Sequence, residues 1–153
     1  SLAFKQHGLE AAAKDQLFGL AFHRTMALCS GPDALEQAIQ TALSEGSVGE
    51  EQVDEIRQGA EKFWQHISQN QLFDGVLEQF NEQRIIAGIN EQKQPDKVWL
   101  KTHEVIVIDF KTGKRNDKDL DQIAAYAKLL GQIFHLPVRA IIYYAQIDLF
   151  LDL

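Results

Sequence analysis

The chain has a single cysteine, Cys29, among its 153 residues. One cysteine excludes an internal disulfide framework and an iron–sulfur cluster held by four local cysteines. The sequence also lacks a run of about 18 apolar residues, and it lacks a basic segment followed by a short apolar stretch. We therefore expect neither a membrane span nor a signal peptide, and we expect a cytoplasmic protein.

Positive charge is also scarce, because 15 lysines and arginines face 22 aspartates and glutamates, which gives a net charge of −7. This balance argues against broad electrostatic attraction to nucleic acid. Residues 84–118 differ from the rest, with 8 basic and 5 acidic side chains. A polyanion would be drawn weakly to this segment. On charge alone, a solvated loop region explains the segment equally well.

The first half of the chain, residues 1–77, reads as mainly helical. Strong helix formers and apolar residues at helical spacing predict three helices, over residues 8–29, 32–46 and 49–70. Asp33 is the expected N-cap of the second helix, and Gly46 is expected just after its end. The connections are short, so we expect a helical cap within one domain of residues 1–153.

The second half, residues 78–153, reads as a sheet core. The predicted elements are a strand with an irregular exit (78–89), two strands joined by a turn near Lys101 to Glu104 (97–111), a helix ending at Gly131 (117–131) and one or two strands (138–153). This order predicts an α/β fold with a right-handed crossover helix.

The two predicted strands of 97–111 place acidic residues together. A turn centred between Thr102 and His103 pairs Val98 with Val107, and it puts Asp96 opposite Asp109. Two such carboxylates repel each other unless a cation lies between them. Lys111 shares the face of Asp109 because side chains alternate along a strand.

Two oxygen ligands beside an ammonium group suit Mg²⁺ and metal-assisted hydrolysis of a phosphodiester. Charged residues at solvated strand ends are the ordinary alternative. The next helix adds Gln122 and Tyr126, which lie four residues apart on one helical face and could reach the same cleft. The alternative for this pair is a surface glutamine and a half-buried tyrosine.

Four motifs together give the chain a family resemblance. "PDKV" from Pro95, "DFKTGK" from Asp109 and "QIAAY" from Gln122 follow an upstream "GLAFH" that ends at His23. In this order they resemble the PD-(D/E)xK nuclease superfamily, and more narrowly the C-terminal nuclease domain of RecB- and AddA-type helicase–nucleases. The resemblance implies a restriction-endonuclease-like core, with a mixed central sheet and a crossover helix, behind a helical N-terminal cap.

The resemblance also implies roles for individual residues. His23, Asp96 and Asp109 would be metal ligands, with the backbone carbonyl of Phe110 as a further ligand. Asp96, Asp109 and Lys111 would form the catalytic set. The glutamine–tyrosine pair of "QIAAY", Gln122 and Tyr126, would contact DNA or support the site.

The function implied by the resemblance is a Mg²⁺-dependent deoxyribonuclease of exonuclease type, with Mn²⁺ as a possible substitute and no iron–sulfur cluster. Its partners would be single-stranded DNA ends and a UvrD/Rep-type helicase motor in the same, longer chain, with a role in DNA repair and recombination. The segment "KTGK" lacks the spacing of a phosphate-binding loop, so ATP hydrolysis is expected elsewhere. Two alternatives remain open: an inactive module that docks DNA or a helicase, and a hydrolase acting on RNA.

Overall fold

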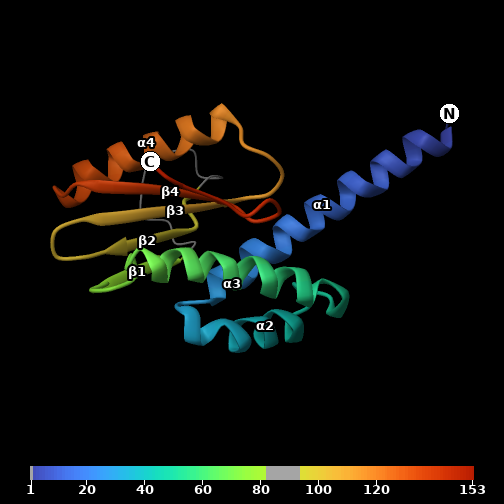
Figure 1. The fold of residues 1–153 in the computed structure, drawn as a ribbon, viewed down its shortest axis with the longest axis horizontal. Helices are drawn as coiled ribbons and strands as arrows, with labels where there is room; N and C mark the ends of the chain where they lie inside the picture. The colour runs from blue at the N-terminus through green and yellow to red at the C-terminus, as the bar shows by residue number, and fades with distance from the viewer. Residues whose placement is uncertain (1, 82–93) are drawn as a thin grey trace.

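The computed structural model describes residues 2–81 and 94–153, which form three helices, a five-stranded sheet and a fourth helix (Figure 1). The helices are α1 (Leu2–Leu28), α2 (Leu35–Ser44), α3 (Val53–Gln69) and α4 (Asp117–Phe134), with 3-10 turns at Pro32–Ala34 and Glu50–Gln52. The strands are β1 (Glu78–Asn81), β2 (Lys97–Leu100), β3 (Val105–Lys111), β4 (Val138–Tyr144) and β5 (Leu149–Asp152). The α/β class and the helical N-terminal region predicted from the sequence are confirmed.

The sheet has the order β1-β2-β3-β4-β5 and is mixed. The central pair β3 and β4 is parallel and is connected through α4, whereas the other neighbours are antiparallel. A parallel pair needs such a crossover, because its connection must return the chain to the same end of the sheet. Of the strand predicted over 78–89, β1 is present, and the remainder lies outside the described residues.

Helices cover both faces of the sheet. Along β3, Ile106, Ile108 and Phe110 join the core under α1, α2 and α3, while Val105 and Val107 join the core under α4. A strand that is covered on both faces is buried throughout, which is why "VIVI" reads as a continuous apolar run rather than an alternating one. The next residue on the α4 face is Asp109.

The aromatic ring of Phe110 fixes the end of β3 against the helical layer. Its centroid lies 4.8 Å from that of Phe63 on α3 and 5.5 Å from that of Phe22 on α1, both in edge-to-face geometry. Such contacts add to the free energy gained from burial. The backbone that carries Asp109 and Lys111 is therefore held to both α1 and α3.

Helix α1 begins at Leu2, ahead of the predicted start at residue 8, because the residues before Gly8 are also good helix formers. All its buried residues lie from Phe18 onward, and its N-terminal part projects away from the sheet (Figure 1). None of the described helices, α1 included, has the length and apolarity needed to cross a membrane.

Two predicted helix ends were wrong. Asp33 is not an N-cap, because a 3-10 turn over Pro32–Ala34 precedes α2 and the cap position falls on Ala34. Gly131 does not end α4, which continues to Phe134 and stops at His135 in the left-handed conformation, with φ of 55°. The nearby Pro137 cannot continue a helix, and this stop outweighs the weaker one at Gly131. By contrast, Gly46 follows α2 with φ of 79°, as predicted.

Candidate active site

Asp109 and Lys111 stand together at the end of β3, on the face covered by α4. Oδ2 of Asp109 lies 2.9 Å from Nζ of Lys111. The side chain of Asp109 is 6% exposed and that of Lys111 is 25% exposed, so the ion pair lies at the border of the interior. The predicted shared face of these two residues is confirmed.

Asp96 lies one residue before β2, and its position corrects part of the predicted pairing. The ladder between β2 and β3 has the predicted register, with Val98 opposite Val107, but it ends at Lys97 and Ile108. Asp96 therefore sits in a bend rather than in a strand paired with Asp109. Its Oδ2 atom instead accepts a 2.7 Å hydrogen bond from the backbone N–H of Phe110.

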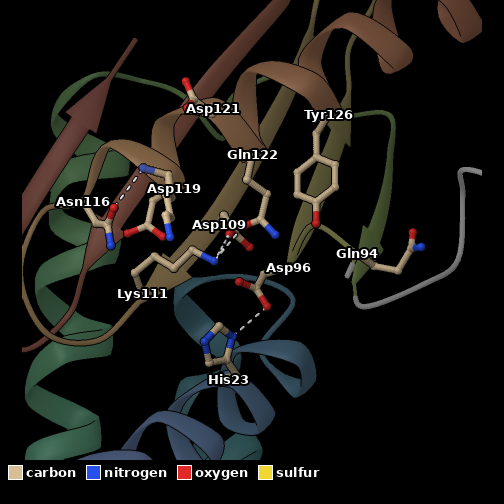
Figure 2. A pocket seen from close by; sticks show the side chains of 11 residues that line it. His23, Gln94, Asp96, Asp109, Lys111, Asn116, Asp119, Asp121, Gln122 and Tyr126 are labelled. Atoms are coloured by element: carbon tan, nitrogen blue, oxygen red, sulfur yellow. Dashed lines mark hydrogen bonds and ion pairs between the residues drawn. The ribbon is translucent and has the colours of Figure 1, made fainter. Parts of the chain in front are cut away.

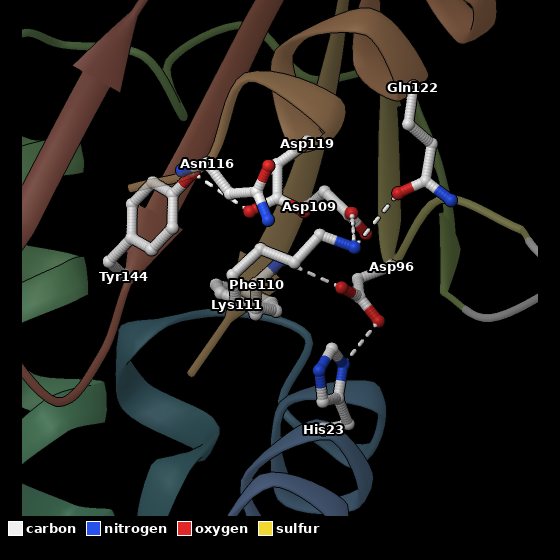
Figure 3. Close-up of polar contacts among 9 residues, drawn as sticks. All are labelled: His23, Asp96, Asp109, Phe110, Lys111, Asn116, Asp119, Gln122 and Tyr144. Carbon is white, nitrogen blue, oxygen red and sulfur yellow. Dashed lines mark hydrogen bonds and ion pairs between the residues drawn. The ribbon is translucent and has the colours of Figure 1, made fainter. Parts of the chain in front are cut away.

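The same carboxylate also contacts helix α1 (Figure 3). Oδ1 of Asp96 lies 2.8 Å from Nδ1 of His23. Burial lowers the pKa of His23, but the hydrogen bond and the charges of Asp96 and Asp109 outweigh burial, so the pKa is raised overall. A raised pKa favours the protonated ring, in which Nδ1 donates to the carboxylate.

Gly19 explains how α1 approaches this end of the sheet. It lies four residues before His23 on the same helical face. A Cβ atom at Gly19 would be only 3.3 Å from Oγ1 of Thr112, directly after β3. Glycine therefore allows the close contact that brings His23 within reach of Asp96.

The two carboxyl groups of Asp96 and Asp109 are both buried, with 7% and 4% of their residue surfaces exposed. Burial and then the neighbouring charge of Asp96 hold the pKa of Asp109 well above its usual range, and Lys111 offsets this only in part. Burial also acts against ionisation of Asp96, but the hydrogen bond and charge of His23 and the hydrogen bonds from Asp109 and Phe110 outweigh burial and lower its pKa. Asp96 therefore favours its charged form, whereas the neighbouring Asp109 resists ionisation.

Helix α4 supplies the two further residues predicted from the sequence. Nζ of Lys111 donates a 2.8 Å hydrogen bond to Oε1 of Gln122. Tyr126 lies one turn further along, and burial, followed by the charges of Asp109 and Asp96, raises its pKa to about 12. The tyrosine hydroxyl therefore stays protonated near neutral pH and can donate a hydrogen bond.

All six side chains predicted for the site, His23, Asp96, Asp109, Lys111, Gln122 and Tyr126, line one open cavity of about 790 Å³ (Figure 2). The seventh predicted residue, Phe110, contributes its backbone. In an extended strand the N–H and C=O of one residue point toward the same neighbour. Because the N–H of Phe110 points to Asp96, its carbonyl lies on that side as well.

Sequence reasoning missed several residues of the cavity wall: Gln94, Asn116, Lys118, Asp119 and Asp121. Asp119 accepts a 2.9 Å hydrogen bond from the hydroxyl of Tyr144. The same hydroxyl oxygen accepts a hydrogen bond from the backbone N–H of Asn116. The helical period could have found Asp119, because it lies three residues before Gln122 on α4. Gln94 gave no such signal, yet both polar atoms of its side-chain amide are buried without a hydrogen-bond partner in the described parts of the chain.

The donor set fits Mg²⁺, although no cage is preformed. Within residues 2–81 and 94–153, no group of three or more His, Cys, Asp or Glu side chains is arranged to hold a metal ion. Asp96 is hydrogen-bonded to His23 and Phe110, and Asp109 faces Lys111. Mg²⁺ keeps several waters and commonly needs only one or two protein carboxylates. Two adjacent buried carboxyl groups are stabilised either by a cation between them or by a proton on one of them.

Comparisons of the chain with models of known protein families and with curated proteins give no match. We therefore infer function from the geometry of the site and from the motifs that meet in it.

Proposed function

We propose that this domain is a Mg²⁺-dependent deoxyribonuclease that hydrolyses phosphodiester bonds. One observation carries the proposal: two buried carboxyl groups, Asp96 and Asp109, meet beside Lys111 at the edge of an open cavity. Such a cluster is unfavourable for a purely structural role, because burial of two neighbouring acids costs free energy unless a cation or proton compensates. A divalent cation bound for catalysis would offset the free energy that burial of the two acids costs.

The residues that would hold the ion are Asp96 and Asp109, with His23 and the backbone carbonyl of Phe110 as further ligands. When bound, Mg²⁺ would polarise the phosphoryl group and lower the pKa of water. The contact between His23 and Asp96 orients both groups in advance. Binding through His23 requires its neutral ring, so metal binding would release a proton from the raised-pKa imidazole.

Lys111 would orient the attacking water and neutralise negative charge on the phosphoryl group. Its ammonium group is restrained from two sides, by Oδ2 of Asp109 and by Oε1 of Gln122. Burial acts to lower the pKa of Lys111, but the charge of Asp109 outweighs it and the pKa is raised. The lysine therefore acts as a positively charged donor rather than as a base.

Tyr126 and Gln122 would form the DNA-facing wall. Both come from α4 and both line the cavity. The tyrosine hydroxyl is a hydrogen-bond donor that suits a phosphate oxygen, since its pKa of about 12 keeps it protonated. The amide of Gln122 has donor atoms besides the oxygen that binds Lys111.

The motifs favour single-stranded DNA ends as the substrate and exonuclease action. They also favour a UvrD/Rep-type motor in a longer chain, as part of a repair and recombination helicase–nuclease. A motor that delivers the strand would supply most of the affinity through effective concentration, which agrees with the net charge of −7 on this domain.

The direct experiment incubates end-labelled single-stranded DNA with the domain in Mg²⁺, and compares wild type with Asp109→Ala and Lys111→Ala. Loss of either group should slow cleavage by about 10²-fold or more. Lys114→Ala is the matched control, because this neighbouring lysine does not line the cavity. Equal activity in all four proteins would contradict the proposal.

Two further measurements separate the alternatives. Binding of DNA without cleavage, unchanged by EDTA and by Lys111→Ala, would identify an inactive docking module. Faster cleavage of an RNA strand than of a DNA strand with the same sequence would identify an RNA hydrolase.

A further inference from the structure

Lys97 is a fully buried lysine next to Asp96, with 0% of its surface exposed. Its Nζ atom donates 2.7 Å hydrogen bonds to the backbone carbonyl of Cys29 and to Oδ1 of Asn81. It also lies 5.8 Å from the centroid of the Trp64 ring. Burial of an ammonium group is costly unless its hydrogen bonds are made, so these partners form a dedicated binding position for it.

The carbonyl of Cys29 directly follows the end of α1 at Leu28. The C-terminal end of a helix carries partial negative charge and leaves its last carbonyl groups without partners in the helix. A lysine ammonium group is a suitable partner for such a carbonyl. Lys97 therefore attaches the first residue of β2 to the end of α1.

Asp96 and Lys97 contact α1 and its C-terminal end from opposite faces of the sheet. The side chain of Lys97 points into the helical layer, as shown by its contacts with Cys29 and Trp64. The side chain of Asp96 lies on the other face, beside Asp109, and reaches His23 near the end of β3. Adjacent residues thus bind His23 in α1 and Cys29 directly after it.

The place of Lys97 in the ladder gives this arrangement a consequence for Asp96. Lys97 is the first paired residue of β2, opposite Ile108, and Asp96 lies just outside the ladder. Backbone pairing alone therefore does not fix the Asp96 carboxylate. Besides the bonds of Asp96 to Phe110 and His23, its movement is limited by the buried side chain of the next residue, Lys97.

We propose that Lys97 is a positioning residue: by binding the carbonyl of Cys29, it holds Asp96 against the N–H of Phe110 and the imidazole of His23. The consequence for a divalent cation rests on the proposed function, since only then are Asp96 and His23 ligands. The positioning of Asp96 itself does not depend on that function.

The test uses Lys97→Met, because methionine is also unbranched and fills the buried space but has no ammonium group to donate hydrogen bonds. Hydrogen exchange of the Phe110 amide, measured by NMR without metal, reports whether Asp96 stays in place. We expect this amide to exchange about tenfold faster or more, since a hydrogen bond with a charged partner contributes that much. The amide of Ile106, deep in the same hairpin, should change less than about threefold, which separates local release from general destabilisation.

Lys101→Met is the control, because Lys101 lies at the other end of the same hairpin and pairs with Glu104. It should leave exchange at Phe110 unchanged. If Lys97→Met does not fold, Asn81→Ala serves instead, because it removes one partner of Lys97 and keeps the lysine. It should accelerate exchange at Phe110 in the same selective way, to a smaller extent.

A second readout, Mn²⁺ affinity by electron paramagnetic resonance, distinguishes the two proposals. Selective acceleration at Phe110 with weaker Mn²⁺ binding supports both. Selective acceleration without any Mn²⁺ binding in wild type supports the positioning role and contradicts the nuclease. Unchanged exchange at Phe110, or equal acceleration along the whole of β3, overturns the positioning role whatever the metal does.

Discussion

The imidazole of His23 lies 2.8 Å from the carboxylate of Asp96, although 73 residues separate them in the sequence. This contact joins the helical N-terminal region to the sheet near the end of β3, which carries Asp109 and Lys111. It makes the first helix a part of the candidate active site rather than only a cover for the core.

Replacement of His23 by alanine should weaken Mn²⁺ binding by about tenfold or more, because it removes a ligand and the group that orients Asp96. Isothermal titration calorimetry measures the affinity. Arg24→Ala is the matched control, since the neighbouring arginine pairs with Glu45 outside the cavity. Equal affinities for wild type and His23→Ala would place the metal away from α1.

Asp109→Asn should stabilise the metal-free domain while abolishing its response to Mg²⁺. The amide removes the buried charge that Asp96 opposes, whereas a bound cation stabilises the wild type by mass action. Thermal unfolding of both proteins in EDTA and in Mg²⁺ tests this. A Mg²⁺-dependent rise in the midpoint that is the same in both would show that Asp109 is not a ligand.

Gln122→Ala should lower the rate of DNA cleavage and leave metal affinity within about threefold of wild type. The reason is that Gln122 is hydrogen-bonded to Lys111 and is not one of the proposed metal ligands. Single-turnover kinetics give the rate, and calorimetry gives the affinity. Gln132→Ala, an exposed position on the same helix, should change neither. A large loss of metal affinity in Gln122→Ala would contradict the assigned role.

Asp148 predicts a pH effect on stability that is separate from the site. Burial opposes its ionisation, but hydrogen bonds from His66 and Tyr143 outweigh burial and lower its pKa. A lowered folded-state pKa means that the unfolded chain binds more protons. The stabilisation is therefore present above about pH 3.9, the ordinary pKa, and is lost as the pH falls through the lower folded-state value.

Asp148→Asn isolates this charge, because asparagine also tolerates the left-handed conformation found here, with φ of 49°. The variant should be less stable than wild type at pH 6, and the difference should shrink toward pH 3. Urea unfolding at several pH values measures it. A difference that is constant across this range would show that the charge of Asp148 contributes nothing.

Local patterns predicted the hairpin and the faces of its strands well. The register of β2 against β3 followed from a short turn and from pairing Val98 with Val107, and the shared face of Asp109 and Lys111 followed from alternation. The shared face of Gln122 and Tyr126 followed from helical spacing. Strand alternation and helical spacing both depend only on residues close in the sequence.

Features that depend on tertiary packing were not predictable in this way. Lys97 reads as a surface residue by type, yet it is fully buried because the end of α1 supplies a carbonyl partner. Asp96 was expected in a strand, but a side-chain bond to Phe110 replaces the ladder there. Tyr144 can bond Asp119 of the cavity wall only because β4 lies beside β3.

The most direct measurement is anomalous X-ray diffraction from a crystal of the domain soaked in Mn²⁺. If Asp96 and Asp109 together hold a divalent cation, one strong anomalous peak should lie between their carboxylates, and the same soak of Asp109→Asn should show none. A wild-type crystal with intact side-chain density and no peak beside these two residues would contradict the proposed metal-dependent nuclease.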